Sequence, residues 1–322
     1  MSSRQALRAI TDNAGEHPAV RAWSRLRGDL PRPEAVELVR KVNSRTTAVR
    51  LLRVGRNGTS VIAKRTESPR AMVEKTMYEN AARYLSMPTL HYYGCVEADS
   101  HSWWVFMEDA GDGSFSFRDD RHRLLAAHWL AGLHTSVPKL DCFPDRGIDH
   151  YHSRMTSARE QIIVNMDNKA LRAEDCALLR RILSHVDLIT QRWERVHVLD
   201  EHLPKSLIHG DFKDGNLRVR DDAGGKVLLV FDWEESGWGL PGVDMWRLDP
   251  ESYWLRVREH WRGMTREDVL HLASVGKLLW CLKAIDWETA NLAHEWLENS
   301  MGSMRVYEEH LTDAIQRTGL LR

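Results

Sequence analysis

The sequence predicts an α+β protein with a small part built on an antiparallel sheet, followed by a larger and mostly helical part. Short apolar runs separated by turn residues dominate residues 35–107, whereas long stretches with helical spacing dominate residues 120–318. We place the boundary at residue 108, so that residues 1–108 and 109–322 form the two parts. The 322 residues suffice for one large or two modest domains.

The amino-terminal part combines helical and strand patterns. Residues 3–27 have helical spacing, interrupted near residues 13–18. Five apolar-rich runs are predicted strands, at 35–42, 48–54, 59–64, 90–96 and 102–107. Asn57-Gly58 lies between the second and third runs and predicts a β-hairpin there. A helix is predicted at 69–85, between the third and fourth strands.

The carboxy-terminal part has helical spacing in most of its length. A first helix is predicted at 120–137, followed by a mostly helical insertion at about 141–205. Three more helices are predicted at about 250–261, 266–299 and 303–318. His128 and His134 lie on the first helix without other metal-ligating residues nearby in the sequence, so we expect them to be structural.

The stretch from 206 to 246 connects these helices and contains the candidate catalytic and metal-binding residues. Two short apolar runs, 206–209 and 226–231, are each followed at once by acidic and polar residues. Between them, residues 217–220 and the turn residues 221–225 predict the first strand and tip of a β-hairpin. A hairpin brings its two ends together, so the two polar loops should face each other.

The residues in these loops suit phosphoryl transfer. Asp211, Lys213 and Asn216 come from the first loop, and Asp232 and Glu234 from the second. Carboxylate and amide oxygens that converge in this way are the ligands that Mg²⁺ prefers. A phosphoryl-transfer site also needs a carboxylate that orients the attacking hydroxyl.

The same stretch resembles known kinases. His209-Gly210-Asp211-Phe212-Lys213-Asp214-Gly215-Asn216 resembles the H-x-D-x-x-x-x-N catalytic loop, and an aspartate at the end of a second apolar run follows 16 residues after the asparagine. The glycine after the histidine, the FDWE at 231–234 and the G-x-P-x-x-D-x-W at 239–246 resemble the aminoglycoside phosphotransferase and choline kinase families. The resemblance implies a two-lobed protein-kinase-like fold, with a nucleotide-binding lobe at 1–108 and a catalytic and acceptor-binding lobe at 109–322.

The resemblance also implies a nucleotide site in the first lobe. The loop at 43–47 corresponds to the loop over the ATP phosphates but contains no glycine, so phosphate contacts would come from its main chain and from Ser44, Arg45 and Thr46. Lys64 would hold the α- and β-phosphates, with Glu79 as its ion-pair partner. The main chain that would bind the base is that of Met107, Glu108, Asp109 and Ala110.

Roles for the loop residues follow from the same resemblance. Asp211 would accept a hydrogen bond from the acceptor hydroxyl and take its proton, and Lys213 would neutralise charge on the γ-phosphoryl group. Asn216 and Asp232 would hold Mg²⁺, with Glu234 as a further ligand. We expect His209 and Asp244 to brace the loops by hydrogen bonds.

Candidate acceptor contacts lie further along the chain. Asp286 falls at the centre of the apolar face of the predicted helix 266–299. A carboxylate there must be paired or must line a cavity, so it either contacts an acceptor or pairs with an arginine such as Arg247 or Arg256. Trp238 and Trp287 are the tryptophans that we expect to face an aromatic or cationic acceptor.

Composition narrows the class of protein. A net charge of −1 argues against general nucleic-acid binding. Residues 1–108 carry 17 basic and 11 acidic side chains and the remainder 28 and 35, which suits a nucleotide on one side and a neutral or cationic acceptor on the other. Four scattered cysteines and no long apolar run predict a cytoplasmic protein without membrane spans.

We therefore expect an ATP- or GTP-dependent, Mg²⁺-assisted kinase that phosphorylates a small-molecule hydroxyl, with an antibiotic as the acceptor that the resemblance favours. The alternatives are a metabolic kinase for choline, a sugar or an amino alcohol, and a catalytically idle module that only binds a nucleotide or a protein. The absence of D-F-G and A-P-E segments disfavours a protein kinase. The acceptor, the choice between ATP and GTP, and the oligomeric state stay open.

Overall fold

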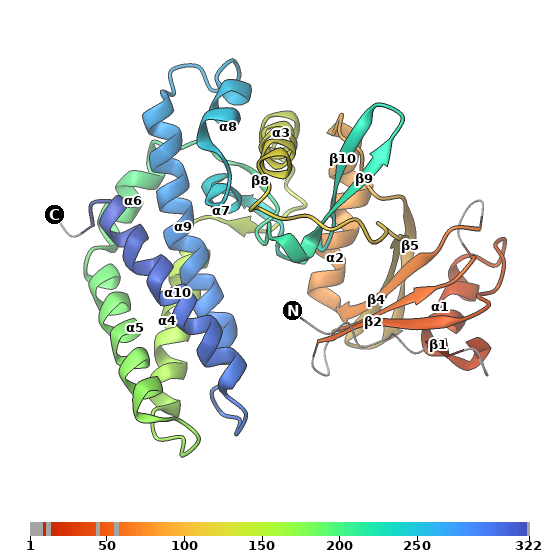
Figure 1. Cartoon of the computed structure of the whole chain (residues 1–322), viewed down its shortest axis with the longest axis horizontal. Coiled ribbons are helices and arrows are strands. Elements are labelled where there is room, and N and C mark those ends of the chain that lie inside the picture. The colour runs from red at the N-terminus through yellow and green to blue at the C-terminus, as the bar shows by residue number, and fades with distance from the viewer. Residues whose placement is uncertain (1–8, 11–13, 43–45, 55–57, 321–322) are drawn as a thin grey trace. The chain divides into compact units, whose positions relative to one another are not determined.

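The chain folds into two compact units that are each discontinuous in sequence (Figure 1). The structure, a computed structural model, describes residues 9–10, 14–42, 46–54 and 58–320. Within these ranges, unit 1 takes its residues from 1–116 and 211–236, and unit 2 from 117–210 and 237–322. The division differs from the one expected at residue 108, because residues 211–236 pack with the amino-terminal part.

Unit 1 contains an antiparallel sheet with the strand order β1-β2-β3-β4-β6-β5. The strands are β1 (Ala9–Ile10), β2 (Val36–Val42), β3 (Thr46–Leu51), β4 (Val61–Glu67), β5 (Tyr92–Asp99) and β6 (Ser102–Glu108). All five strands predicted from the sequence are present. Of the stretch 3–27 with interrupted helical spacing, the described residues form β1 at 9–10, a 3₁₀ turn (Ala14–Glu16) and α1 (Pro18–Leu26).

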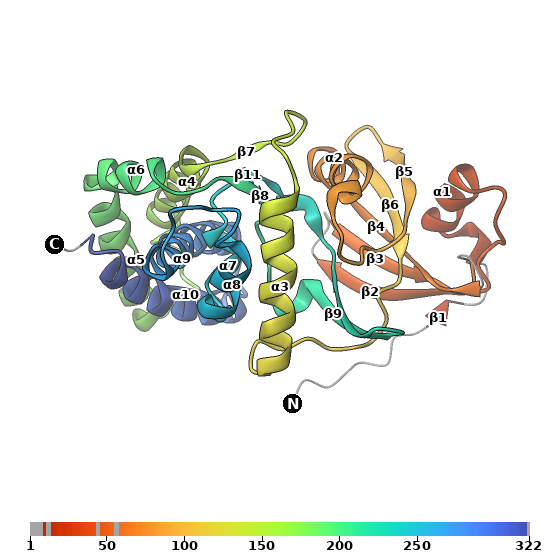
Figure 2. The same ribbon diagram turned by 90° about the horizontal axis from the view of Figure 1, so that it is seen from above.

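Alternation along β6 explains how the two faces of this sheet are covered. Trp104 and Phe106 pack in one core with Trp23 of α1, whereas Val105 and Met107 pack in a second core with Ala71. Ala71 belongs to α2 (Ser68–Thr76), which continues through a π-helical turn (Met77–Ala81) and a 3₁₀ turn (Ala82–Tyr84). Figure 2 shows α1 and α2 on opposite sides of the sheet.

The hairpin of β9 (Leu217–Asp222) and β10 (Gly225–Val230) completes unit 1. Leu229 belongs to the same core as Ala71 and Met107, so the hairpin is anchored by apolar packing. The loops at its two ends are those predicted to carry the chemistry.

Unit 2 is mostly helical. Its helices are α3 (Asp120–Ser136), α4 (Ile148–Asn165), α5 (Ala173–Gln191), α6 (Trp193–Glu201), α7 (Gly242–Met245), α8 (Pro250–Val257), α9 (Arg266–Thr289) and α10 (Glu298–Arg317). A small sheet joins β7 (Asp145–Arg146), β11 (Gly237–Gly239) and β8 (Ser206–Ile208) in that order. The central helix is α9, which packs against α10, α4, α7 and α8 (Figure 1).

The end of α9 corrects one prediction. The sequence pattern extended this helix to residue 299, but it ends at Thr289, and α10 begins at Glu298. Between them the chain turns, and the amide group of Asn168 donates to the carbonyl oxygens of Leu292 and His294 at 2.6 and 2.9 Å. A partner outside the helix thus satisfies these main-chain groups, which spacing alone does not reveal.

In the part of the chain that the structure describes, no helix combines the length and apolar character needed to cross a membrane.

Candidate active site

The loop after β8 gathers the three predicted catalytic side chains. Asp211 is buried, and its Oδ2 atom lies 2.7 Å from Nζ of Lys213. The amide nitrogen of Asn216 donates to the main-chain oxygen and to Oδ2 of Asp211, at 2.9 and 3.0 Å. These contacts hold the carboxylate, the ammonium and the amide as one cluster.

The hairpin then carries the second acidic loop to this cluster. The register pairs Leu217 with Val230, and the N–H group of Phe231 donates to the carbonyl of Asn216 at 3.2 Å. Asp232 follows directly and has left-handed backbone angles, φ 69° and ψ 56°. A residue other than glycine is strained in this region, and such strain concentrates at functional sites.

Lys64 is buried and contacts three carboxylates, of which one is fully buried and two are partly exposed. Its Nζ atom lies 2.9 Å from Glu74 and 3.1 Å from Glu234, and it also donates to Asp232. Burial alone would lower the pKa of Lys64, but the attraction of the carboxylates, with Asp232 first, outweighs it and raises this pKa well above its ordinary value. Lys64 is therefore a fixed positive charge beside the acidic loop.

The ion pair predicted between Lys64 and Glu79 is formed by Glu74 instead. Glu74 is fully buried, whereas the side chain of Glu79 is 46% exposed and lies 3.9 Å from Nζ of Lys75. The reason is the phase of the helix: Glu74 follows Ala71 by three residues and faces the sheet with it, while Glu79 lies in the π-helical turn. The three-residue spacing between Ala71 and Glu74 was the one feature of the sequence that could have indicated Glu74 as the partner of Lys64.

Glu234 has partners that the sequence did not indicate. Its carboxylate lies 3.2 Å from Nη1 of Arg70 and accepts a hydrogen bond from Oγ1 of Thr66 at 3.4 Å. Arg70 comes from the first turn of α2 and Thr66 from β4, so two neighbouring elements orient this side chain.

The oxygen donors present fit a magnesium ion bound together with a nucleotide. Among the residues that the structure describes, none donates a hydrogen bond to the buried Oδ1 atom of Asn216, although its amide nitrogen makes two hydrogen bonds to Asp211. Within the described ranges, no three His, Cys, Asp or Glu side chains are arranged as a metal site by themselves. Mg²⁺ is commonly held by one or two carboxylates together with substrate phosphates and water. Asn216 and Asp232 are the residues that could supply the protein's share of such a set.

In the segment 107–110, which was predicted to bind the base, some main-chain groups already form hydrogen bonds within the protein. The N–H groups of Glu108 and Asp109 donate to the carbonyls of His91 and Ser60, at 2.8 and 3.3 Å. The side chain of Asp109 lies 2.6 Å from Nε of Arg50. A base would therefore have to use the main chain nearer Ala110, or carbonyl groups.

The structure describes only part of the predicted phosphate loop. Ser44 and Arg45 lie outside the described residues, and Thr46 is the first residue of β3, described in its main chain alone.

Unit 2 carries the predicted acceptor residues. Asp286 is 8% exposed and lies 2.9 Å from Nη1 of Arg154. The ion pair that we considered is thus formed, but with Arg154. Trp287 follows on the same helix, and the ammonium group of Lys283 lies 5.0 Å from the centre of its ring. Trp238 lies in β11, opposite Leu207 of β8.

The arginines proposed as partners of Asp286 have other contacts. The guanidinium group of Arg247 lies 4.3 Å from the centre of the Trp246 ring, and Arg256 lies 3.5 Å from Nδ1 of His128. Spacing along one helix could not select Arg154, because it comes from α4, more than a hundred residues earlier.

The bracing predicted for Asp244 is confirmed. This buried carboxylate accepts hydrogen bonds from the N–H groups of His209 and Gly210, at 2.7 and 2.9 Å. His134 is also structural, as expected: its ring lies 2.7 Å from the hydroxyl of Tyr253 and 3.4 Å from Asp244.

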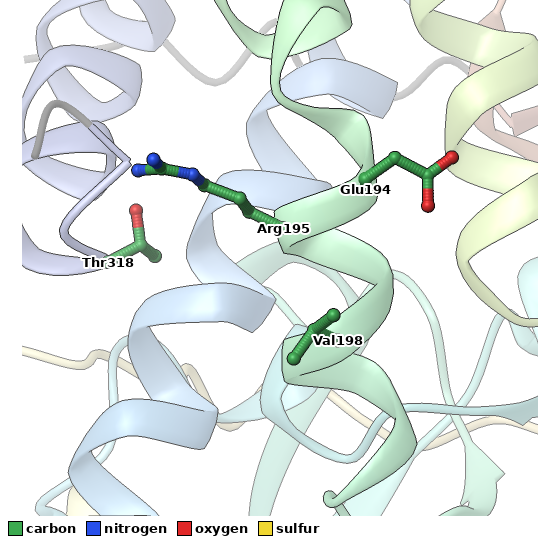
Figure 3. A pocket seen from close by; sticks show the side chains of 4 residues that line it. All are labelled: Glu194, Arg195, Val198 and Thr318. Carbon is green, nitrogen blue, oxygen red and sulfur yellow. The ribbon is translucent and has the colours of Figure 1, made fainter.

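Two pockets of moderate size are lined by residues outside the loop 209–216. One, of about 310 Å³, is lined by Glu194, Arg195, Val198 and Thr318, and Figure 3 shows the Arg195 side chain directed toward Thr318 and Glu194 directed away. The other, of about 370 Å³, is lined by residues 78, 82, 89–92 and 108. Of the predicted site residues, they include Glu108.

Comparison with known proteins agrees with the kinase-like fold. A model of the phosphotransferase enzyme family (APH) matches residues 39–274. No curated protein matches the chain significantly in sequence.

Solved structures resemble most of the chain at low sequence identity. A spectinomycin phosphotransferase, APH(9)-Ia, in complex with ADP and spectinomycin has a TM-score of 0.59 at 10% identity, over 91% of this chain and 96% of that one. The GDP and kanamycin complex of an APH(2″) enzyme has 0.61 at 12%, over 91% and 98%. A choline kinase from Cryptosporidium parvum Iowa II has 0.58 at 10%, over 89% and 91%. These similarities show the fold.

Proposed function

Because the chain belongs to the phosphotransferase enzyme family, we propose that it transfers the γ-phosphoryl group of ATP or GTP to a hydroxyl group of a small molecule. One observation supports this function above the others. Asn216 is bound to Asp211 through its amide nitrogen, while its buried oxygen accepts no hydrogen bond from any residue that the structure describes. A buried acceptor without a donor is costly, and a metal ion beside the catalytic carboxylate would satisfy it.

Each residue has a distinct part in the proposed reaction. Asp211 accepts a hydrogen bond from the acceptor hydroxyl, orients it and takes its proton as the phosphoryl group is transferred. Lys213 offsets negative charge on the transferred group, and Lys64 donates to the phosphates that stay with the nucleotide. Asn216 and Asp232 would hold Mg²⁺, with Glu234 as a further ligand. The ion would supply charge neutralisation of the phosphates.

For the acceptor, we propose an antibiotic with a reactive hydroxyl. Two structures with the same fold contain spectinomycin and kanamycin, and the acidic balance of residues 109–322 suits a cationic acceptor. In this assignment, Asp286, Trp238 and Trp287 contact the acceptor.

A metabolic kinase for an amino alcohol or a similar small acceptor is the second candidate, and one contact favours it. Arg154 neutralises Asp286, and the ammonium group of Lys283 lies over Trp287 nearby. These residues together carry no net negative charge, which suits a small or neutral acceptor better than a polycation. A choline kinase and an aminopropanol kinase are among the proteins with this fold.

A ligand screen separates the candidates. Thermal shifts would be measured with aminoglycosides, nucleoside antibiotics, choline and sugars, each with Mg²⁺ and a non-hydrolysable ATP or GTP analogue. Binding stabilises the folded state by an amount that increases with the ratio of the ligand concentration to its Kd, so at equal concentrations the true acceptor should give the largest further shift. If nothing binds with Mg²⁺ and nucleotide, and no acceptor is phosphorylated, the idle module is the correct alternative.

Removal of the catalytic carboxylate is the decisive variant. We expect Asp211→Asn to lower kcat by about 10²- to 10⁴-fold, because the acceptor hydroxyl loses its proton acceptor. Asp221→Asn, at the exposed tip of the same hairpin, is the matched control and should keep wild-type kcat. Equal kcat values for Asp211→Asn and the wild type would exclude the proposed role.

We also propose that the protein works in the cytoplasm. Its four cysteines are free thiols, as a reducing compartment would keep them.

A further inference from the structure

A buried lysine of α9 contacts the main chain next to the catalytic aspartate. Lys283 is 2% exposed, and its ammonium group donates a hydrogen bond to the carbonyl oxygen of Gly210. The same ammonium group lies 5.0 Å from the centre of the Trp287 ring, within range of a cation–π contact. Burial of a lysine is costly unless its charge is well solvated by the protein, so this position calls for an explanation.

Together with Asp244, Lys283 holds three consecutive peptide groups. Asp244 accepts from the N–H groups of His209 and Gly210, which belong to the peptides 208–209 and 209–210. Lys283 binds the carbonyl of the next peptide, 210–211. The negatively charged Asp244 thus accepts hydrogen bonds from the two N–H groups, and the positively charged Lys283 donates one to the carbonyl oxygen. Charge-assisted hydrogen bonds of this kind are the stronger ones.

The third peptide matters most, because it leads directly into Asp211. A peptide group is planar, so fixing the carbonyl of Gly210 also fixes the N–H bond of Asp211 and one of the bonds at its Cα atom. Gly210 itself has φ of 79°, a left-handed conformation that costs glycine little. Without a partner for its carbonyl, this flexible residue would leave the next peptide plane free to turn.

We propose that Lys283 is a positioning residue for Asp211, which acts through the Gly210 carbonyl rather than through contact with a substrate. This inference rests on the proposed function, in which Asp211 is the proton acceptor. Catalysis depends steeply on the placement of such a group, since a displacement of about 1 Å can cost about 100-fold in rate.

The chain offers a matched control on the same helix. Lys277 also lies on α9, is largely buried and forms an ion pair with Asp313 at 2.7 Å, away from the peptides of residues 208–211. Lys283→Met and Lys277→Met therefore remove the same group from the same helix. If Lys283→Met does not fold, Lys283→Gln takes its place in every comparison.

The experiment combines kinetics with hydrogen exchange. We expect Lys283→Met to lower kcat by about 10- to 100-fold with an unchanged KM for the nucleotide, whereas Lys277→Met keeps the wild-type kcat. Lys283→Arg, which keeps a buried cation and donor, should recover part of the lost rate. Amides in peptides that cover residues 207–216 should exchange faster in Lys283→Met than in Lys277→Met.

Two results would overturn the proposal. One is a wild-type kcat in Lys283→Met; the other is a loss of rate equal to that of Lys277→Met, with no selective change in exchange at 207–216. The exchange measurement needs no acceptor. If the wild type phosphorylates nothing, the proposed function fails, while the exchange comparison still decides whether Lys283 holds the loop.

Discussion

At the scale of single residues, the site is defined by charges that are buried together. Lys64 contacts the carboxylates of Glu74, Asp232 and Glu234, and Arg70 contacts Glu234 as well. A buried ammonium group with this many carboxylates keeps its charge and restricts where the acidic side chains can lie. The sequence revealed Lys64, Asp232 and Glu234 through their motifs, but Glu74 only becomes visible once the helix is placed on the sheet.

The correction of the ion pair can be tested with two glutamates. We expect Glu74→Gln to destabilise the protein by about 1–3 kcal/mol, since Lys64 loses one charged partner in a buried site but keeps two. Glu79→Gln should change stability by less than about 0.5 kcal/mol, because this side chain is exposed. Urea unfolding measures both, and the KM for the nucleotide should rise in Glu74→Gln. Equal effects of the two substitutions would show that Glu79 is as good a candidate as Glu74 for the ion-pair partner of Lys64.

At the scale of elements, close packing of α7 against α9 positions the two residues that bind the main chain of residues 209 and 210. Asp244 belongs to α7 and Lys283 to α9, and the two helices meet at Gly242 and Gly276. A Cβ atom at Gly276 would lie 1.8 Å from the carbonyl carbon of Gly242, so there is no room for a side chain. Both glycines are visible in the sequence, but nothing in the pattern indicates that they touch.

A pair of glycine substitutions tests this contact. Gly276→Ala should destabilise the protein by about 1–3 kcal/mol through overpacking, and kcat should fall because the helices that hold residues 208–211 are forced apart. Gly302→Ala, in α10 with no heavy atom within 4 Å of the new Cβ, should stabilise it by about 0.5–1 kcal/mol. Thermal unfolding and kcat measure the outcome. A neutral Gly276→Ala would show that the helices can separate at no cost.

At the scale of the whole molecule, each of the two units is built from two separate stretches of the chain. The chain leaves unit 1 after residue 116 and forms the first part of unit 2 with residues 117–210. It returns to unit 1 for residues 211–236 and then completes unit 2. Linear division at residue 108 could not show this, because the hairpin is joined to unit 1 by apolar packing of Leu229 and not by sequence proximity.

Titrating groups in both units should make the protein less stable in acid. Burial lowers the pKa of His17, His128 and His310 from 6.5. Hydrogen bonds lower the pKa of Asp99 to about 2, with that from the His101 main chain first, and lower that of Asp268, with that from Thr265 first. In each case the unfolded chain binds protons more readily, so protonation favours unfolding.

We therefore expect the free energy of unfolding to decrease as the pH falls below about 6.5 and more steeply below about 4, where unfolded aspartates take up protons. Urea unfolding between pH 3 and 7 measures the curve. In Asp268→Asn, the loss below pH 4 should be smaller, because one carboxylate with a lowered pKa is gone. A stability that stays constant or increases down to pH 4 would contradict this assignment.

The sequence by itself determined the fold class, the strands and most helices, and the cluster of Asp211, Lys213 and Asn216. These depend on residues close together in the chain, where spacing, turn chemistry and the hairpin dictate geometry. Only the tertiary structure decided that Glu74 forms an ion pair with Lys64 and that Arg154 forms one with Asp286. It also decided that Lys283 donates a hydrogen bond to the carbonyl of Gly210. Such partners lie on different elements, and a buried charge takes whichever opposite charge or dipole the packing brings within reach.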